Sequence, residues 1–405
     1  MAILVLNCGS SSVKYQLFKI KLKDVLAQGI VSAIGSPQAA ITHQQVNKQK
    51  FTQTVTVSDH AQAIDYILGK LTNTQDGILK DKKEINAIGH RVVHGGKRFS
   101  KSVMVTEETK QGIRDCIDLA PLHNPHNLEG ISSCEKLLPG VLQVAVFDTA
   151  FHQTIPEYAY TYGIPYEIAE TYHIRRYGFH GTSHQFVAEK AAELMHAEIE
   201  KLKIITCHIG NGCSIAAINN GRSIDTSMGF TPLEGLLMGT RCGDLDPAVP
   251  TFLMSKNNMK PDEIDRILND KSGLLGIAGT TNDMRILISE AKAGSSRAQL
   301  AIDIFCYRIK KYIAAYCGVL NGADSIVFTA GIGENAHEIR KKCCEGLEFF
   351  GIHIDDTAHI KKTGMPISIS SPHSKIKVFV IPTNEELMIA REAKLFLDNI
   401  SMNKL

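Results

Sequence analysis

The sequence predicts an α/β fold, and three observations favour this class. Short apolar or alternating segments of strand length recur between longer segments with a helical period. A strand–turn–strand unit at residues 3–18 returns, with a similar plan, at residues 204–218. Hydrophobic residues make up 44% and charged residues 21% of the chain, which is ordinary for a globular protein. With 405 residues, the chain is long enough for roughly two or three domains.

Composition and charge exclude several classes of partner. The formal net charge is +2, so we expect no strongly basic face for nucleic acid. The apolar run at residues 3–6 is too short for a signal peptide or a membrane span, so we expect no membrane partner. The ten cysteines show no CxxC pair and no zinc-type spacing, which favours reduced thiols and a cytoplasmic location.

The opening segment predicts two strands joined by a polar turn. Residues 3–6 are apolar and predict a short buried strand, and residues 13–17 alternate between apolar and polar side chains, as in a second strand. The turn at residues 7–12 offers backbone N–H groups and hydroxyls, and Lys14 adds a cation, which is chemistry for holding a phosphate. The P-loop and the dinucleotide fold place a helix after such a turn, so the following strand separates this segment from both.

The elements of the first two thirds are predicted from period, turn residues and helix-start signals. Polar alternation at residues 44–56 predicts an exposed hairpin, and apolar runs at 85–88 and 141–147 predict buried strands. Pro261 stands before two acidic residues, which is typical of the first turn of a helix.

The last third predicts alternating helices and strands. An amphipathic helix runs through residues 300–316 and ends near Gly322. The apolar residues 325–330 predict a strand, followed by a glycine-rich loop at 331–335 and a further helix. Apolar positions with helical spacing predict a C-terminal helix at 385–399.

The second strand–turn–strand unit has two interpretations. Residues 204–218 place His208 before a Gly210–Asn211–Gly212 turn and a second apolar strand after it. Two such units fit a duplicated domain that holds a nucleotide between its halves. They also fit two ordinary hairpins, because glycine-rich turns are common.

The glycine-rich loop near residue 331 also has competing interpretations. Residues 331–336 satisfy G-x-G-x-x-A between a strand and a helix, and Asp355 and Asp356 follow roughly 20 residues later, as in a dinucleotide fold. Glu334 and Asn335, however, put a negative charge and a bulky amide where a pyrophosphate would approach. The segment also leaves little chain for the rest of a dinucleotide fold. Adenosine recognition by this strand–loop–helix edge avoids both difficulties.

Two arginines stand in glycine-flanked segments. Arg91 lies within residues 89–96 after a predicted strand, and Arg241 lies within residues 240–244. Each could be an ordinary surface charge. Together they could also form a bidentate clamp on carboxylate or phosphoryl oxygens.

Histidines and one acid end other predicted elements. His123 lies in a proline-containing loop at 121–127, and His180 lies in a glycine-rich turn at 177–184. Asp148 follows the apolar strand that ends at residue 147. Structural or surface placement is the alternative for each histidine. The sequence contains no HExxH pair for zinc and no G-x-S-x-G elbow for a serine nucleophile.

Taken together, these motifs resemble the acetokinase family of the actin-like, hexokinase-like ATPase superfamily. The matching segments span the whole chain in the family's order: 7–14, 89–96, 147–152, 178–184, 208–212, 226–247, 282–285, 331–335 and 382–386. Departures from the common family pattern are Cys242 and residues 278–281, outside the positions assigned to chemistry. The resemblance argues against the dinucleotide interpretation.

The resemblance implies a fold, a reaction and partners. The fold is two duplicated ribonuclease-H-like domains around a nucleotide cleft, one of residues 1–149 with a C-terminal helix at 385–405, the other of residues 150–384. The reaction is the reversible transfer of the ATP γ-phosphoryl group to acetate, giving acetyl phosphate and ADP, with Mg²⁺ (or Mn²⁺) as cofactor. The family also implies a homodimer.

The resemblance also assigns catalytic roles. Arg91 and Arg241 clamp the acetate carboxylate and the phosphoryl group, and His180 and His123 stabilise phosphoryl oxygens. Asp148 matches the catalytic aspartate. Because acetate is already ionised at pH 7, we expect Asp148 to orient Arg91, water or Mg²⁺ rather than to act as a base.

The binding residues follow from the same matches. Asn7 and Glu385 match positions associated with Mg²⁺. The apolar pocket for the acetate methyl group consists of Val93, Leu122, Phe179 and Pro232. The nucleotide residues are Ser10, Ser12, Lys14, His208, Ile209, Gly210, Asn211, Gly212, Asp283, Met284, Arg285, Gly331, Ile332, Gly333, Glu334 and Asn335.

Two further functions remain open at this point. Another short-chain acyl kinase, such as a propionate kinase, would share most of these residues. A non-catalytic ATP-binding or regulatory protein could share the fold, but a binding module does not need the full set of reactive side chains, which is Arg91, Asp148, His180, Arg241 and Glu385.

Overall fold

The computed structural model describes residues 1–22, 24–73, 75, 77–355, 357–360 and 364–402. Asp356 and the last three residues of the predicted C-terminal segment therefore lie outside the described residues. The chain forms two compact units. Unit 1 is Met1–Ala150 with Asn384–Leu405, and unit 2 is Phe151–Thr383.

Unit 1 is built on an eight-stranded sheet with the order β5-β4-β3-β2-β1-β6-β8-β7. β1 is antiparallel to β2 and parallel to β6, and β6 is parallel to β8. The strands are β1 (Ala2–Gly9), β2 (Ser12–Lys19), β3 (Val25–Ser32), β4 (Ala40–Gln45), β5 (Phe51–Thr54), β6 (Ile85–Val92), β7 (Val103–Met104) and β8 (Leu142–Phe147). The helices are α1 (His60–Thr72), a 3-10 helix at Lys82–Glu84, α2 (Glu107–Arg114), α3 (Asn124–Leu137) and α14 (Glu385–Met402).

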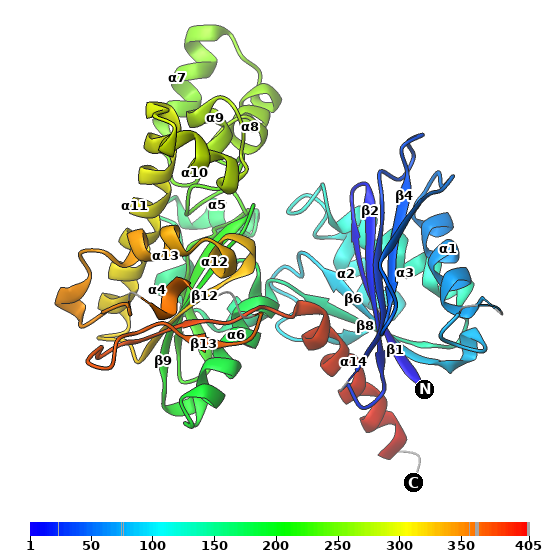
Figure 1. The fold of residues 1–405 in the computed structure, drawn as a ribbon. Coiled ribbons are helices and arrows are strands. Elements are labelled where there is room, and N and C mark those ends of the chain that lie inside the picture. The colour runs from blue at the N-terminus through cyan, green and yellow to red at the C-terminus, as the bar shows by residue number, and fades with distance from the viewer. Residues whose placement is uncertain (23, 74, 76, 356, 361–363, 403–405) are drawn as a thin grey trace. The chain divides into compact units, whose positions relative to one another are not determined.

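Helices cover both faces of this sheet (Figure 1). Leu4 and Leu6 of β1 belong to a core that also contains buried residues of α1 and α3. Ile3 and Val5 point to the other face, where they pack with Ile389 and other residues of α14. Because side chains alternate along a strand, a strand buried on both faces reads as a continuous apolar run, as β1 does.

Unit 2 is built on a six-stranded sheet with the order β11-β10-β9-β12-β14-β13. Its strands are β9 (Lys203–Ile209), β10 (Cys213–Asn219), β11 (Arg222–Thr226), β12 (Ser325–Thr329), β13 (Ile367–Ser368) and β14 (Lys377–Val380). Its helices are α4 (Glu157–Tyr160), α5 (Tyr166–Thr171), α6 (Gly181–Leu194), α7 (Ala248–Asn257), α8 (Pro261–Asp270), α9 (Gly273–Ala278), α10 (Met284–Lys292), α11 (Ser296–Val319), α12 (Ala330–Asn335) and α13 (His337–Cys344). Further 3-10 helices lie at Ala150–Thr154, Ile199–Lys201, Glu348–Phe350 and Ala358–Ile360.

The two sheets repeat one topology. In unit 1 the order β3-β2-β1-β6-β8 begins with an antiparallel meander and continues with parallel strands, and β7 closes the edge antiparallel to β8. In unit 2 the order β11-β10-β9-β12-β14 has the same directions, and β13 closes the edge antiparallel to β14. The β1–β2 and β9–β10 hairpins occupy equivalent places. The prediction of a duplicated α/β fold is therefore confirmed over the interpretation as unrelated hairpins.

Most predicted elements are confirmed. The exposed hairpin appears as β4 and β5, whose outer strand is exposed along its length. The helix predicted from Pro261 is α8, and the side chain of Glu263 accepts the backbone N–H of Lys260, completing the N-terminal cap. The long amphipathic helix is α11, and the C-terminal helix is α14.

Several loop boundaries were predicted wrongly. The first turn is only Ser10–Ser11, because Asn7 and Cys8 pair with Lys14 and Val13 inside the hairpin. β6 continues to Val92, because β1 and β8 pair with it on both sides and outweigh the low strand propensity of its glycine.

Three glycine- or proline-containing segments predicted as loops are helical, two of them in part and one along its whole length. α3 begins at Asn124, with Pro125 in the first turn, so His126 lies in the helix. α6 begins at Gly181, directly after His180. The predicted glycine loop at 331–335 is itself the short helix α12, which follows β12 without a connecting loop.

Gly89 fixes how α14 packs on the sheet, and we expect Gly89→Ala to destabilise unit 1. A Cβ at this position would lie 2.5 Å from Cγ2 and 3.1 Å from the backbone oxygen of Ile389. Overpacking of this kind costs about 1–3 kcal/mol of unfolding free energy. Urea unfolding measures it, and Gly69→Ala is the matched control. Gly69 lies in α1, and a Cβ built there would have nothing within 4 Å, so alanine at this position should raise the unfolding free energy by about 0.5–1 kcal/mol. Equal stability of Gly89→Ala and the parent chain would contradict the packing.

Candidate active site

Three strand ends of unit 1 bring predicted residues onto one face. Leu6 of β1 pairs with His90 of β6. Because side chains alternate along a strand, the next residues, Asn7 and Arg91, both point to the other face of the sheet, the face that α14 covers. The backbone N–H of Asp148 donates to the oxygen of Val92 at 2.9 Å, which continues the β6–β8 pairing by one step. Arg91 and Asp148, far apart in sequence, thereby meet at the carboxyl ends of parallel strands.

Arg91 and Asp148 form a fork-shaped ion pair. The Nε of Arg91 donates to both carboxylate oxygens of Asp148 at 3.0 Å, and its Nη2 donates to Oδ2 at 2.5 Å. The side chain of Asp148 is 3% exposed and that of Arg91 21%. Burial alone would lower the pKa of Arg91, but the charges of Asp148 and Glu385 and the hydrogen bond to Asp148 outweigh it and raise the pKa. Arg91 is therefore a permanent, rigidly held cation.

The first turn of α14 adds two acids to this group. Oε1 of Glu386 forms an ion pair with Nζ of Lys14 at 2.6 Å, and Lys14 is the cross-strand partner of Asn7. Glu385 is half-buried, and its pKa is raised by burial and by the charges of Asp148 and Glu386, although Arg91 and Lys14 oppose this. Crowded carboxylates beside an amide oxygen are a donor set that suits a hard divalent cation.

Glu386 was not assigned a role from the sequence. Its only signal was its place next to Glu385 in the 382–386 segment. Lys14, which the sequence predicts to contact phosphate, is the exposed partner in the ion pair with Glu386.

The start of α3 holds the segment after β6. The side chain of Asn127 accepts the backbone N–H of Val93 at 3.1 Å and donates to the oxygen of Cys8 at 2.9 Å. The amide of Asn124 bonds both the N–H and the oxygen of His94, at 3.2 and 3.0 Å. These buried asparagines, missed from the sequence, join the ends of β1 and β6 to α3.

The residues predicted near these asparagines differ in exposure. Val93 is 8% exposed, whereas Leu122 is 68% exposed. His123 is half-buried at the N-terminus of α3. Ser10 and Ser12 lie at the β1–β2 turn, Ser10 exposed and Ser12 half-buried.

In unit 2, His180 stands at the N-terminus of α6 in a left-handed conformation with φ of 56°. A non-glycine residue there is uncommon and marks a position held by its surroundings. Its Nδ1 makes a hydrogen bond with Oγ of Ser214 at 2.9 Å, and its ring stacks on that of His208, with 4.1 Å between centroids. The ring orientation is therefore fixed by β9 and β10.

His180 and Arg241 converge on the β9–β10 turn. A Cβ built on Gly212 would lie 3.5 Å from Nε2 of His180 and 3.8 Å from Nη1 of Arg241. The same Nη1 donates to the backbone oxygen of Pro232 at 3.2 Å. Burial lowers the pKa of Arg241, although the guanidinium stays charged at neutral pH. The structure thus groups His180, Arg241, Gly212 and Pro232, which the sequence proposed separately.

A network of buried histidines supports this group. His184 bonds Ser214 through Nε2 and Thr206 through Nδ1, both at 2.7 Å. His152 donates from Nε2 to the oxygen of Phe179 at 3.0 Å. Burial lowers the pKa of His184 far below its ordinary value and that of His152 to about 4, so both are neutral at pH 7.

Buried histidines position other residues of this group. His152 fixes the backbone of Phe179, a predicted methyl-pocket residue that is 2% exposed. His208 bonds Ser183 at 2.8 Å, and Ser183 in turn bonds Thr383 at 2.8 Å. The matching segments 147–152 and 178–184 contain His152 and His184, but the sequence assigned neither of them a role.

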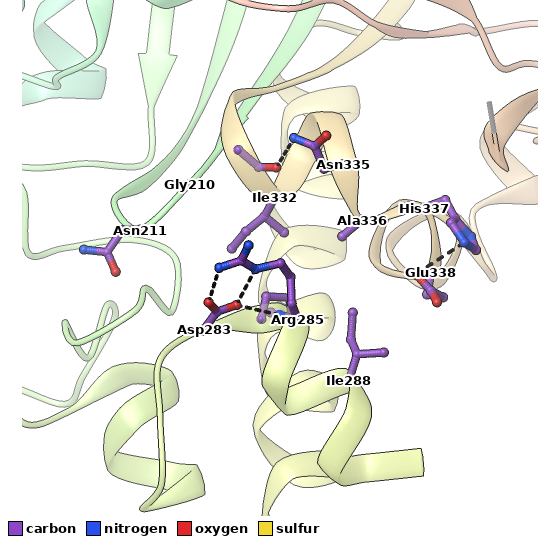
Figure 2. Close-up of a pocket in the computed structure, with 12 residues that line it drawn as sticks. Gly210, Asn211, Asp283, Arg285, Ile288, Ile332, Asn335, Ala336, His337 and Glu338 are labelled. Atoms are coloured by element: carbon purple, nitrogen blue, oxygen red, sulfur yellow. Dashed lines mark hydrogen bonds and ion pairs between the residues drawn. The ribbon is translucent and has the colours of Figure 1, made fainter. Parts of the chain in front are cut away.

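A pocket of about 730 Å³ lies between the β9–β10 turn, α10 and α12, and Figure 2 shows it. Its size is within the range of small-molecule sites, about 300–1,000 Å³. Predicted nucleotide residues line it, namely Gly210, Asn211, Asp283, Met284, Arg285, Gly331, Ile332 and Asn335. Lining residues that the sequence did not suggest are Ile288, Ala336, His337 and Glu338.

Charged side chains mark one wall of this pocket. Arg285 forks onto Asp283, with Nε at 3.0 Å and Nη2 at 2.5 Å (Figure 2). The hydrogen bond from Arg285 lowers the pKa of Asp283 to about 2. Two apolar side chains also line the pocket: Ile332 lies on α12, and Ile288 lies on α10, the helix that also carries Arg285. An apolar wall with a few fixed polar groups is typical of a small-molecule site.

Other predicted nucleotide residues lie outside this lining. His208 and Gly212 belong to the His180 group, and Ile209 is buried. The carboxylate of Glu334 accepts the backbone N–H of Thr383 at 3.2 Å, so it ties α12 to the end of unit 2. Gly333 lies where α12 packs on β9: a Cβ built on Gly333 would lie 3.5 Å from the Cβ of Ile209.

Comparison with known proteins decides the family. The sequence profile of the Acetokinase family matches residues 2–391. The chain belongs to this family. An acetate kinase of Caldicellulosiruptor saccharolyticus is 55% identical over 98% of this chain and 100% of its own length. An acetate kinase of Halothermothrix orenii is 53% identical, with the same coverage.

Solved structures agree with this membership. The crystal structure of Porphyromonas gingivalis acetate kinase matches with a TM-score of 0.94 and 47% identity over 98% of this chain and 99% of that one. A propionate kinase of Francisella tularensis matches with a TM-score of 0.91 and 44% identity, covering 97% and 99%. As a member of the acetokinase family the chain is a kinase, and the family implies ATP as its co-substrate.

Membership also resolves one earlier alternative. The acetokinase family excludes the dinucleotide-dependent interpretation of residues 331–336, and Asp355 instead accepts the backbone N–H groups of Thr357 and Ala358 in its own turn. Among the described residues, none of the helices combines the length and apolar character needed to cross a bilayer.

Proposed function

We propose that this kinase transfers the γ-phosphoryl group of ATP reversibly to acetate, giving acetyl phosphate and ADP. The observation that carries the proposal is the Arg91–Asp148 fork, in which a buried carboxylate after β8 holds a half-buried guanidinium of β6 rigidly beside the acids of the first turn of α14. The named acetate kinases among its relatives support the same acceptor.

Arg91 is proposed to hold the acceptor carboxylate. Asp148 accepts hydrogen bonds from Nε and Nη2 of Arg91. The third nitrogen, Nη1, is not used in this pair and is proposed to donate to a substrate oxygen. Acetate is ionised at pH 7 and attacks as an anion, which makes a general base unnecessary. Asp148 accepts three hydrogen bonds from Arg91, two from Nε and one from Nη2. Its proposed role is therefore to orient Arg91 and not to accept a proton. The task of the site is positioning and charge neutralisation.

Residues of unit 2 are proposed to stabilise the transferring phosphoryl group. His180 and Arg241 converge beside the Gly210–Gly212 turn, so both can donate to anionic oxygens. The pocket beside Asp283 and Arg285 is proposed to hold the adenosine part of ATP. Ser10, Ser12, Lys14 and His123 of unit 1 are proposed to contact phosphate oxygens in the same reaction.

Mg²⁺, or Mn²⁺ in its place, is proposed to bind through the oxygens of Asn7 and Glu385. The residues fit such an ion, because three carboxylates and an amide gather on one face; the pKa of Glu385 is raised first by burial and then by the charges of Asp148 and Glu386. The bound ion would neutralise charge on the ATP phosphates.

For Asn7→Ala we expect the Mg²⁺ concentration at half-maximal rate to rise about tenfold, with an intact fold, because one oxygen donor is lost. Mg²⁺ titration of the steady-state rate measures this. Asn86→Ala is the control, since Asn86 lies at the opposite end of the sheet, where it bonds the N–H of Ala2 at 3.1 Å. A normal Mg²⁺ requirement in Asn7→Ala would make Asn7 only a structural residue of the hairpin.

The methyl group of acetate is proposed to contact Val93, Leu122, Phe179 and Pro232. A pocket discriminates one methylene by about 1–3 kcal/mol, so propionate should be a poorer but real substrate. We expect Val93→Ala to shift the acetate-to-propionate ratio of kcat/KM about tenfold toward propionate. Val105→Ala, a half-buried site beyond β7, is the control. An unchanged ratio would remove Val93 from the pocket.

A second candidate function is propionate kinase, because a solved propionate kinase is 44% identical with a TM-score of 0.91. Trapping the acyl phosphate with hydroxylamine, using Mg·ATP and acetate, propionate or butyrate, distinguishes the two. The highest kcat/KM on acetate supports the proposal, and the highest on propionate supports the alternative. Absence of any acyl phosphate would overturn both and point to a non-catalytic member of the fold.

The setting of this activity is also a proposal. We propose a cytoplasmic homodimer, in line with the reduced, unpaired state of the ten cysteines. We propose domains at 1–149 with 385–405 and at 150–384, and the compact units differ from these by one residue at each boundary. Sedimentation of the purified chain tests the dimer.

A further inference from the structure

Unit 1 contains a second cluster of ligand-type side chains, on the face of the sheet opposite α14. His60 is the first residue of α1, and His126 and Glu129 lie one turn apart on α3. One ligand atom from each of these three residues lies within 4.8 Å of the other two. α1 and α3 pack together over the core that contains Leu4 and Leu6 (Figure 1). The cluster is therefore separate from the Arg91 group.

The hydrogen bond of His60 determines which of its nitrogens can bind an ion. Nε2 of His60 lies 2.6 Å from the backbone oxygen of Gly9. A carbonyl oxygen only accepts, so Nε2 carries the proton and donates it. In the neutral ring, Nδ1 then presents a lone pair. A histidine that donates one N–H to a backbone carbonyl and presents its other nitrogen is the usual arrangement of a metal ligand.

Two electron-pair donors then face each other. Nδ1 of His60 lies 3.2 Å from Oε2 of Glu129, and the carboxylate oxygen is also an acceptor. Nδ1 of His126 lies 3.7 Å from the same oxygen, and this atom is buried and makes no hydrogen bond among the described residues. The arrangement requires a positive centre between the three atoms.

We propose that His60, His126 and Glu129 bind a divalent transition-metal ion of the Zn²⁺ class. Bonds of about 2.0–2.2 Å to a tetrahedral ion place ligand atoms roughly 3.3–3.6 Å apart, and the distances of 3.2 and 3.7 Å bracket this range. Two imidazoles and one carboxylate favour Zn²⁺ over Mg²⁺ or Ca²⁺, which prefer oxygen ligands. A water completes the fourth position.

The surroundings allow the ion to enter and connect the site to the proposed phosphate turn. The side chains of His126 and Glu129 are 31% and 41% exposed, whereas His60 is 5% exposed and anchored by Gly9. Gly9 is the last residue of β1, directly before the Ser10–Ser11 turn. A bound ion would hold α1, α3 and this turn together.

The experiment is Zn²⁺ titration of the full chain after chelator treatment, with saturating Mg²⁺ present. We expect one tight Zn²⁺ per chain, a tetrahedral absorption spectrum when Co²⁺ replaces Zn²⁺, and a melting temperature that rises with Zn²⁺. Affinity should fall at least about tenfold in His126→Ala and in Glu129→Gln, which alter half-exposed positions and leave the anchored His60 in place.

His373→Ala is the matched control, because His373 and His353 form another histidine pair, 4.7 Å between centroids, outside this cluster. Its Zn²⁺ affinity should equal that of the parent chain. Equal Zn²⁺ binding by the parent and Glu129→Gln, or no tight site in the parent, would overturn the proposal. The cluster would then be an ion pair in which a proton on His60 supplies the positive centre.

Discussion

Arg91→Ala is expected to lower kcat by about 10²–10³, the cost of removing one preorganised donor from a transition state. The guanidinium is held by three hydrogen bonds to a carboxylate that is 3% exposed, so it needs no reorganisation when the acceptor binds. Arg91→Lys should lose most of the same activity, because an ammonium is a point charge and cannot bond Asp148 and a substrate oxygen in one plane. Initial rates of acyl phosphate formation measure both.

Two comparisons separate catalysis from stability in these variants. Arg91→Ala leaves Asp148 buried without its cation, which itself destabilises the fold. The double variant Arg91→Ala/Asp148→Asn removes both charges, so it should recover unfolding free energy but not activity. Arg98→Ala is the surface control, since Arg98 pairs with an exposed Glu108. Activity of Arg91→Ala within about threefold of the parent chain would remove Arg91 from the transition state.

The fold was predictable where burial leaves a clear pattern. β1 is buried on both faces and reads as an apolar run, and β12 does the same. Their turns were less predictable. Asn7 and Cys8 have turn-like composition, but pairing with β2 keeps them in the strand. Likewise, Gly89, two residues before Arg91, suggested a loop, whereas it is required for the close approach of Ile389.

The site was predictable as a set of residues but not as a geometry. Family motifs identified Arg91 and Asp148, while their meeting depends on the order β1-β6-β8 and its register, which no local pattern encodes. The pair of Glu386 with Lys14 joins the two ends of the chain for the same reason. The buried, neutral state of a histidine such as His184 has no sequence signature, because only burial and hydroxyl partners distinguish it from a surface histidine.

His180→Asn is expected to lower kcat by about 10²–10³ with little change in melting temperature. His180 has a φ of 56°, and asparagine tolerates this conformation better than alanine does, so the variant avoids added backbone strain. The side-chain amide of asparagine is shorter than imidazole and cannot reach the position of Nε2 of His180, which lies 3.5 Å from a Cβ built on Gly212. Gly212→Ala should act similarly without removing a donor, because its methyl group fills the space between His180 and Arg241 without a clash.

The matched control for the histidine is His196→Asn. His196 has a φ of 51° and is exposed, so the same substitution is made in the same backbone conformation at a solvent position. Its kcat should stay within about twofold of the parent chain, since surface changes of this kind rarely act on distant chemistry. If His180→Asn kept parental kcat while Gly212→Ala lost it, the turn would be the functional element and His180 only its support. Parental kcat in both would place phosphoryl stabilisation elsewhere, with Arg241 as the next residue to replace.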